Sequence, residues 1–75
     1  MSDVNSSFNR LYWESSYEIV LALIDVHPQL EPDGVGLDEL KRLITSLPNF
    51  ADDPAMANES ILNEILREWY EEVNP

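Results

Sequence analysis

The feature that most constrains the fold is a helical repeat of apolar residues near the end of the chain. These residues form two neighbouring rows: Ile61, Ile65 and Trp69, then Leu62, Leu66, Tyr70 and Val73. Two adjacent rows at this spacing make the wide apolar stripe of a helix that packs against a core. We therefore expect a long helix near residues 58–72, which the rest of the chain must cover.

Two start signals precede this helix. In Asp52-Asp53-Pro54, a carboxylate is able to accept hydrogen bonds from free backbone N–H groups, and proline presets the first helical φ angle. Asn58, followed by Glu59, is a second capping signal. The pattern predicts a short helical turn that leads into the long helix.

A first helix is predicted near residues 15–26, with Ser15 or Ser16 as its cap. It ends at His27 because the residue before a proline avoids helical geometry. The residues expected to face inward are Trp13, Tyr17, Ile19, Val20, Leu23, Ile24 and Val26. His27 is the one imidazole of the chain, and we interpret it as a packed or capping group rather than a metal ligand.

A turn-rich loop through residues 29–34 separates this helix from another near 38–46, for which Asp38 is the predicted cap. Its buried stripe is expected to contain Leu37, Leu40, Leu43, Ile44 and Leu47. The fold class that follows is a mostly α, small single domain of about three helices.

The charge of the chain bears on its partners. Fifteen Asp and Glu residues against four Lys and Arg give a formal net charge of −11. A nucleic-acid-binding protein neutralises phosphates with cations, so this balance excludes that class. The same field attracts metal cations and basic protein surfaces. A hydrophobic content of 44% and two tryptophans argue against disorder as the explanation of the charge.

The acidic residues follow helical spacing. Glu14, Glu18 and Asp25 fall in one narrow sector of the first helix, and Glu64, Glu68 and Glu72 repeat every four residues on the last. Glu71 and Glu72 lie near the negative end of a helix dipole, where anions are disfavoured. Such faces are either a binding surface for cations and basic partners or a solvated exterior, and spacing leaves both interpretations open.

The remaining limits come from length and from absent motifs. Seventy-five residues make one domain, which we place at 13–75 after a flexible tail at 1–12. The chain contains no cysteine and no recognisable catalytic motif, so we expect a non-enzyme without catalytic residues. Without a signal peptide or a membrane-spanning run, we expect a cytoplasmic monomer with no membrane partner. Clustered carboxylates without thiols suit hard cations, held weakly.

A resemblance to a known family supplements these arguments. It rests on a colinear series of residues: Trp13, Glu18-Ile19, Asp25-x-His27-Pro28-x-Leu30-Glu31-Pro32, Phe50-x-Asp52-Asp53-Pro54, Asn58-Glu59-x-Ile61-Leu62 and Trp69-x-Glu71-Glu72. In this order the chain resembles the IscX family of bacterial iron–sulfur cluster assembly accessory proteins.

The resemblance implies a winged-helix-like fold and a non-enzymatic adaptor or regulator that docks on a cysteine desulfurase. It also implies weak binding of iron, Fe²⁺ or Fe³⁺, with no tightly bound cofactor. The metal-binding residues it implies are Glu18, Asp25, Glu31, Asp52, Asp53, Glu71 and Glu72. The residues expected to contact the desulfurase are Glu14, Glu18, Asp25, Glu31, Glu71 and Glu72. The alternative is an acidic protein-interaction module with no metal role.

Overall fold

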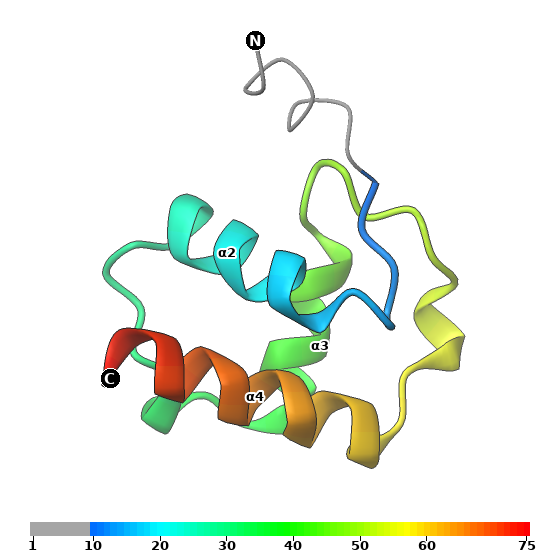
Figure 1. Ribbon diagram of the computed structural model, residues 1–75. Coiled ribbons are helices and arrows are strands. Elements are labelled where there is room, and N and C mark those ends of the chain that lie inside the picture. Colours follow the sequence, from blue (N-terminus) through cyan, green and yellow to red (C-terminus); the bar gives the residue numbers. More distant parts are fainter. Residues whose placement is uncertain (1–9) are drawn as a thin grey trace, which may run out of the picture.

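Three α-helices and two short 3₁₀ turns make up the structure, a computed structural model that describes residues 10–75 (Figure 1). The elements are α2 (Ser16–Val26), η1 (Pro32–Gly34), α3 (Leu37–Thr45), η2 (Pro54–Met56) and α4 (Glu59–Val73). The three predicted helices are confirmed, and each end lies within one residue of the expected one. The part of the predicted tail at residues 1–9 lies outside the described residues.

The start signals of the last two elements act as their sequence predicts. The Asp53 carboxylate accepts a hydrogen bond from the Ala55 N–H at 3.0 Å and caps η2, in which Pro54 is the first residue. The Asn58 side chain accepts from the Ile61 N–H at 2.9 Å and caps α4. Each cap satisfies one of the backbone donors that a helix start leaves free.

The caps of the two earlier helices differ from expectation. Ser15 occupies the cap position of α2, but its side chain makes no capping hydrogen bond. The prediction that Asp38 caps the next helix is wrong, because α3 begins at Leu37 and its cap residue is Gly36. Asp38 instead lies in the first turn of α3, where a carboxylate still interacts favourably with the helix dipole.

The core lies where α2 and α4 pack side by side and α3 closes one face. Both α2 and α4 run in the same direction, and α3 contacts both of them (Figure 1). The buried apolar residues are Leu11, Trp13, Ile19, Val20, Leu23, Val35, Leu40, Ile44, Leu47, Leu62, Ile65 and Trp69. The predicted inward rows of all three helices therefore supply most of this core.

The segment before α2 is held against the loop before η2. Leu11 donates its N–H to the Asn49 carbonyl and accepts from the Ala51 N–H, each at 2.9 Å, which forms an isolated parallel bridge opposite Phe50. The Trp13 and Phe50 rings meet edge to face with centroids 5.0 Å apart. Because Leu11 is also buried, the packed domain begins before the predicted start at Trp13.

That bridge is the one β interaction among residues 10–75, which contain no strand. The class of a mostly helical single small domain is confirmed. The winged-helix likeness is not confirmed, since the described part of the chain shows no β wing.

Several residues expected to face the core are exposed instead. Tyr17 and Val26 of α2, and Tyr70 and Val73 of α4, each expose at least 40% of their surface. Those expectations were wrong because, within residues 10–75, no helix or 3₁₀ turn covers these side chains. The exposed tyrosines in turn give the surface two large aromatic groups, which bear on the sites described next.

Candidate protein-binding surface

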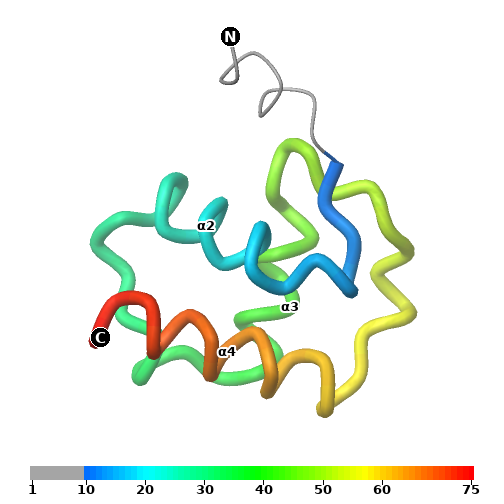
Figure 2. Tube along the Cα trace, in the orientation of Figure 1, coloured from blue at the N-terminus to red at the C-terminus, as the bar shows by residue number. Residues whose placement is uncertain are grey.

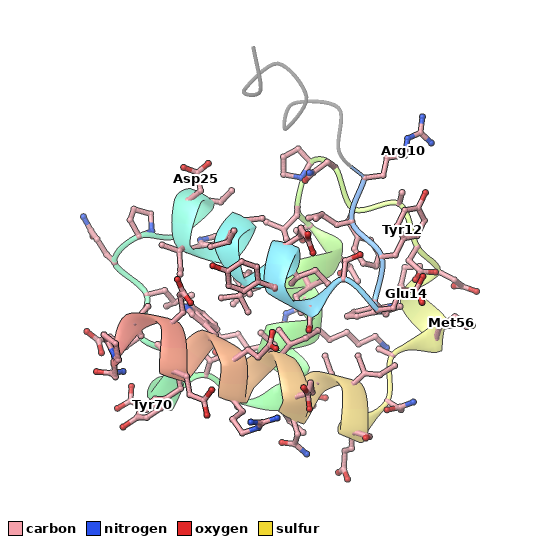
Figure 3. All side chains as sticks on the ribbon, in the orientation of Figure 1. Arg10, Tyr12, Glu14, Asp25, Met56 and Tyr70 are labelled. Carbon is pink, nitrogen blue, oxygen red and sulfur yellow. The ribbon has the colours of Figure 1, made fainter. Side chains whose placement is uncertain are left out.

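The outer face of α2 combines acidic and apolar groups. Glu14, Glu18 and Asp25 are all exposed, but only Glu18 and Asp25 lie on α2, where at 100° per residue they share one sector with Tyr17 and Leu21. The expectation that Glu14 falls in the same sector is wrong, because α2 begins at Ser16 and Glu14 lies in the turn before it. In Figure 3, Glu14 lies on the segment before the helix, and Asp25 lies near the end of α2. The outer face of α2 therefore offers a partner two apolar contacts and two carboxylates. We call Tyr17, Glu18, Leu21 and Asp25 the α2 face.

A second acidic group gathers where α2 and α4 end. The two helices finish at the same end of the molecule, and the loop after α2 passes beside the end of α4 (Figure 2). Asp25, Glu31, Glu71 and Glu72 thus lie at the same end of the molecule and all four are exposed, although the Asp25 side chain points away from α4 (Figure 3). Neither helix has a basic residue in its last turn. Two negative helix ends thus add to the four carboxylates, and we call this region the acidic end.

Arg67 is the cation closest in sequence to the acidic end. Its guanidinium forms ion pairs with Glu64 at 3.0 Å and with Glu71 at 3.6 Å. The hydrogen bond from Arg67 to Glu64, with the charges of Glu64 and Glu71, raises the pKa of the Arg67 side chain. All three side chains are well exposed, so these pairs tether Arg67 locally without compensating Glu31 or Glu72.

Asp52 and Asp53 lie at the other end of the molecule, where they hold the chain together. Asp52 accepts from the Trp13 N–H at 2.9 Å and from the Asp53 N–H at 2.7 Å, one bond to each carboxylate oxygen. The Asp53 carbonyl accepts from the Trp13 indole N–H at 2.8 Å. The pair thereby ties the segment around Trp13 to the loop before η2. The sequence signal of two adjacent acids before a proline did not reveal this structural role.

The seven predicted metal ligands are thus distributed over both ends of the molecule. Glu18 lies between them, in the first turn of α2. Among residues 10–75, no three His, Asp or Glu side chains converge in a way that could hold a metal ion. The sequence also predicted separate patches, because the spacing of these acids matches no known metal-binding motif. Metal binding at these patches stays a prediction.

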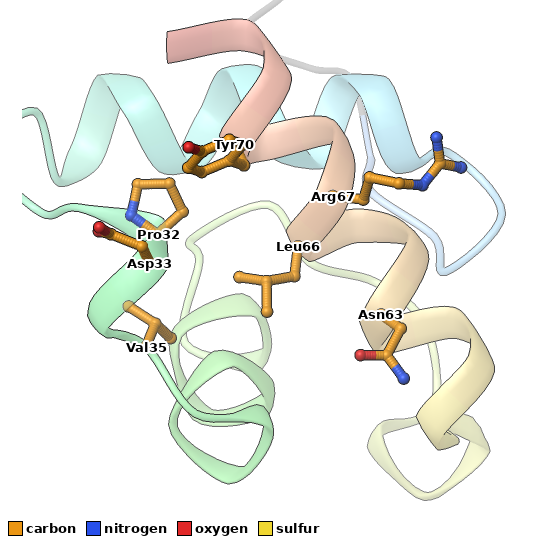
Figure 4. A pocket seen from close by; sticks show the side chains of 7 residues that line it. All are labelled: Pro32, Asp33, Val35, Asn63, Leu66, Arg67 and Tyr70. Carbon is orange, nitrogen blue, oxygen red and sulfur yellow. The ribbon is translucent and has the colours of Figure 1, made fainter. Parts of the chain in front are cut away.

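A groove between η1 and α4 was not predicted from sequence. Its volume is about 470 Å³, and it is lined by Pro32, Asp33, Val35, Asn63, Leu66, Arg67 and Tyr70 (Figure 4). The sequence had assigned Leu66 and Tyr70 to the buried stripe of the last helix. Because η1 is short and does not reach over them, Tyr70 is 49% exposed. The sequence signal that could have located the groove is the wide apolar stripe of α4. A neighbouring element as short as η1 covers only part of such a stripe. We call it the η1–α4 groove.

Comparison with known proteins bears on what these surfaces are for. Residues 11–74 match the family described as "Iron-sulphur cluster assembly". The chain belongs to this family. The match includes every helix of the structure, and it confirms the resemblance to IscX proteins on which the sequence interpretation drew.

One relative illustrates how far the likeness extends. The uncharacterized protein PA3808 of Pseudomonas aeruginosa is 36% identical over 62 residues, which cover 83% of this chain and 94% of that protein. The two proteins therefore match over nearly the whole domain. In residues 10–75, no helix has the length and apolar character needed to cross a membrane.

Proposed function

We propose that this protein is a non-enzymatic adaptor or regulator of iron–sulfur cluster assembly, which acts in the cytoplasm as a monomer. It docks on a cysteine desulfurase through the α2 face and the acidic end, and it binds iron weakly through exposed carboxylates. The observation that carries the proposal is that exposed acids lie on one helix face and at one end of a member of an assembly family, and that among the described residues Glu71 alone of these acids forms an ion pair.

Electrostatics favour docking on a basic surface. The net charge of −11 raises the encounter rate with a positively charged partner. Tyr17 and Leu21 provide apolar contacts within the α2 face, and tyrosine is among the residues that most often contribute strongly at interfaces. Exposed acids around such contacts act mainly on the association rate and on specificity.

Charge reversal tests the docking surface. Glu18→Lys combined with Asp25→Lys should slow association with purified cysteine desulfurase about tenfold and flatten its dependence on salt. Both residues are exposed. Lysine is unfavourable in the first turn of a helix and favourable in the last, so the two changes offset each other in stability.

The matched control reverses two exposed acids on α3, Asp38→Lys with Glu39→Lys, which gives the same change in net charge. Thermal melts of both variants establish that they are folded. Equal effects of the two pairs would mean that net charge alone drives binding. Normal binding by the α2 variant would remove the α2 face from the interface.

Weak iron binding is tested by NMR titration with Fe²⁺ under anaerobic conditions. Paramagnetic broadening should appear at Glu18 and at the acidic end, with water completing the coordination. Broadening at Asp52 should be weaker, because both of its carboxylate oxygens already accept hydrogen bonds. Binding should weaken as the pH falls, since protons compete with the ion for carboxylates.

Charge reversal of Glu71 and Glu72 should remove part of the broadening. The alternative function, an acidic interaction module with no metal role, predicts desulfurase binding without any broadening. Response centred on His27 alone would also count against the carboxylate patches, because His27 supplies nitrogen rather than oxygen.

A further inference from the structure

We propose that the η1–α4 groove is a second docking surface, which takes one apolar side chain from a basic segment of a partner protein. The groove is distinct from the α2 face and does not depend on the desulfurase proposal. It is open along one side, so a segment of chain is able to lie across it (Figure 4).

The apolar part of the groove comes from two elements. Pro32 and Val35, from η1 and the residue after it, are buried on one side. Leu66 points from α4 toward them in Figure 4, and Tyr70 lines the same space. A volume of about 470 Å³ lies within the range of known ligand pockets, about 300–1,000 Å³. The space therefore accommodates a large apolar side chain such as Leu or Phe.

The charges around this apolar space favour a basic segment. Asp33 lines one wall, while Glu64 and Glu71 stand next to the groove stripe on α4, on the side of Arg67. In Figure 4, Arg67 points away from η1, and its guanidinium is paired with those two glutamates. Asp33 is the carboxylate that lines the groove, and the two glutamates beyond Arg67 more than balance the charge of Arg67, so the region around the groove is net negative. We call this region the negative rim. Lys or Arg on either side of the apolar anchor would complement it.

A second copy of this chain does not fit the same site. Each copy carries a net charge of −11, so the long-range field opposes self-association. The chain also offers only four Lys and Arg residues with which to meet the negative rim of another copy. A basic partner satisfies both the apolar space and the rim.

The test uses three synthetic peptides and the full chain, followed by amide NMR shifts. The probe is acetyl-Lys-Arg-Leu-Phe-Arg-Lys-amide. One comparison peptide replaces all four basic residues by Glu, and the other replaces Leu-Phe by Ser-Ser. We expect the probe to shift resonances of groove residues and both comparison peptides to bind at least about fivefold more weakly.

Two variants with matched controls locate the contact. Tyr70→Ala and Asp33→Lys should each weaken the probe about fivefold or more. Tyr12→Ala is the control for the first, because Tyr12 is also an exposed tyrosine, at 39%, and lies in neither docking surface. Asp38→Lys, an equal charge change on α3, is the control for the second. Both controls should bind the probe as the unaltered chain does.

Three results would overturn the proposal. Equal binding of the Ser-Ser peptide would show attraction by charge alone. Absence of groove shifts at millimolar probe would show that the groove has no affinity for this chemistry. Groove shifts that depend on protein concentration without any peptide would assign the surface to a second copy. Desulfurase binding by the α2 variants tests only the docking proposal, and peptide binding by the groove variants tests only the groove proposal. A failure of one proposal is therefore distinguishable from a failure of the other.

Discussion

Removal of the Trp69 side chain is the most severe single test of this fold. Trp69 is fully buried on the α4 face that packs into the core. Trp→Ala at such a site costs roughly 3–5 kcal/mol, because the transfer energy of the ring is lost and the cavity closes only in part. A single core in a domain this small rarely supplies more than about 3–5 kcal/mol. We therefore expect Trp69→Ala to be largely unfolded at room temperature.

The two tryptophans provide a matched comparison. The buried indole N–H of Trp69 makes no hydrogen bond with any described residue, whereas that of Trp13 donates to the Asp53 carbonyl. Trp69→Phe should cost about 1–2 kcal/mol through lost volume alone. Trp13→Phe should destabilise the protein by about 1 kcal/mol more than Trp69→Phe does, because it also removes a hydrogen bond.

Urea unfolding followed by far-UV circular dichroism measures the free energy of unfolding of all three variants. If Trp69→Ala unfolds cooperatively with a urea midpoint close to that of the unaltered chain, the burial argument is refuted, because the folded state would then not depend on the Trp69 ring. Equal costs of the two Phe variants would refute the role assigned to the Trp13 hydrogen bond.

Further predictions concern individual polar contacts. Asn58→Ala should destabilise the protein by about 1 kcal/mol, and Ser15→Ala by clearly less, because only the Asn58 side chain caps its helix; urea midpoints distinguish them. Asp52→Ala should cost about 1–3 kcal/mol and speed hydrogen exchange of the Trp13 amide, whose acceptor it removes; unchanged exchange would contradict this. Arg67→Gln should leave the melting temperature unchanged, because both of its ion pairs are exposed; a clear drop would show that these pairs stabilise the fold.

The helices were predictable from sequence because their signals are local. Apolar residues at a spacing of three and four specify a helix and its buried row without knowledge of the neighbour. A cap such as Asn58 bonds to a backbone N–H only three residues away, so the start of α4 could be predicted from the sequence. The exposed acids of the α2 face were also predictable, since they lie opposite an apolar row.

The sites depend on contacts between distant segments, which sequence did not specify. Tyr70 looked buried because it continues an apolar row, but the shortness of η1 leaves it at the edge of a groove. Asp52 was predicted to be a metal ligand, which stays a prediction; the sequence did not indicate that its carboxylate also accepts the N–H of Trp13, 39 positions earlier.

What the sequence alone determined about this protein is its class, its helices and its negative charge. The tertiary structure decided which carboxylates gather at one end, which are occupied by backbone N–H groups, and which apolar residues stay uncovered. The physical reason is that helical periodicity and capping are properties of neighbouring residues. The burial or exposure of a helix edge, in contrast, is set by how far the element packed against it extends.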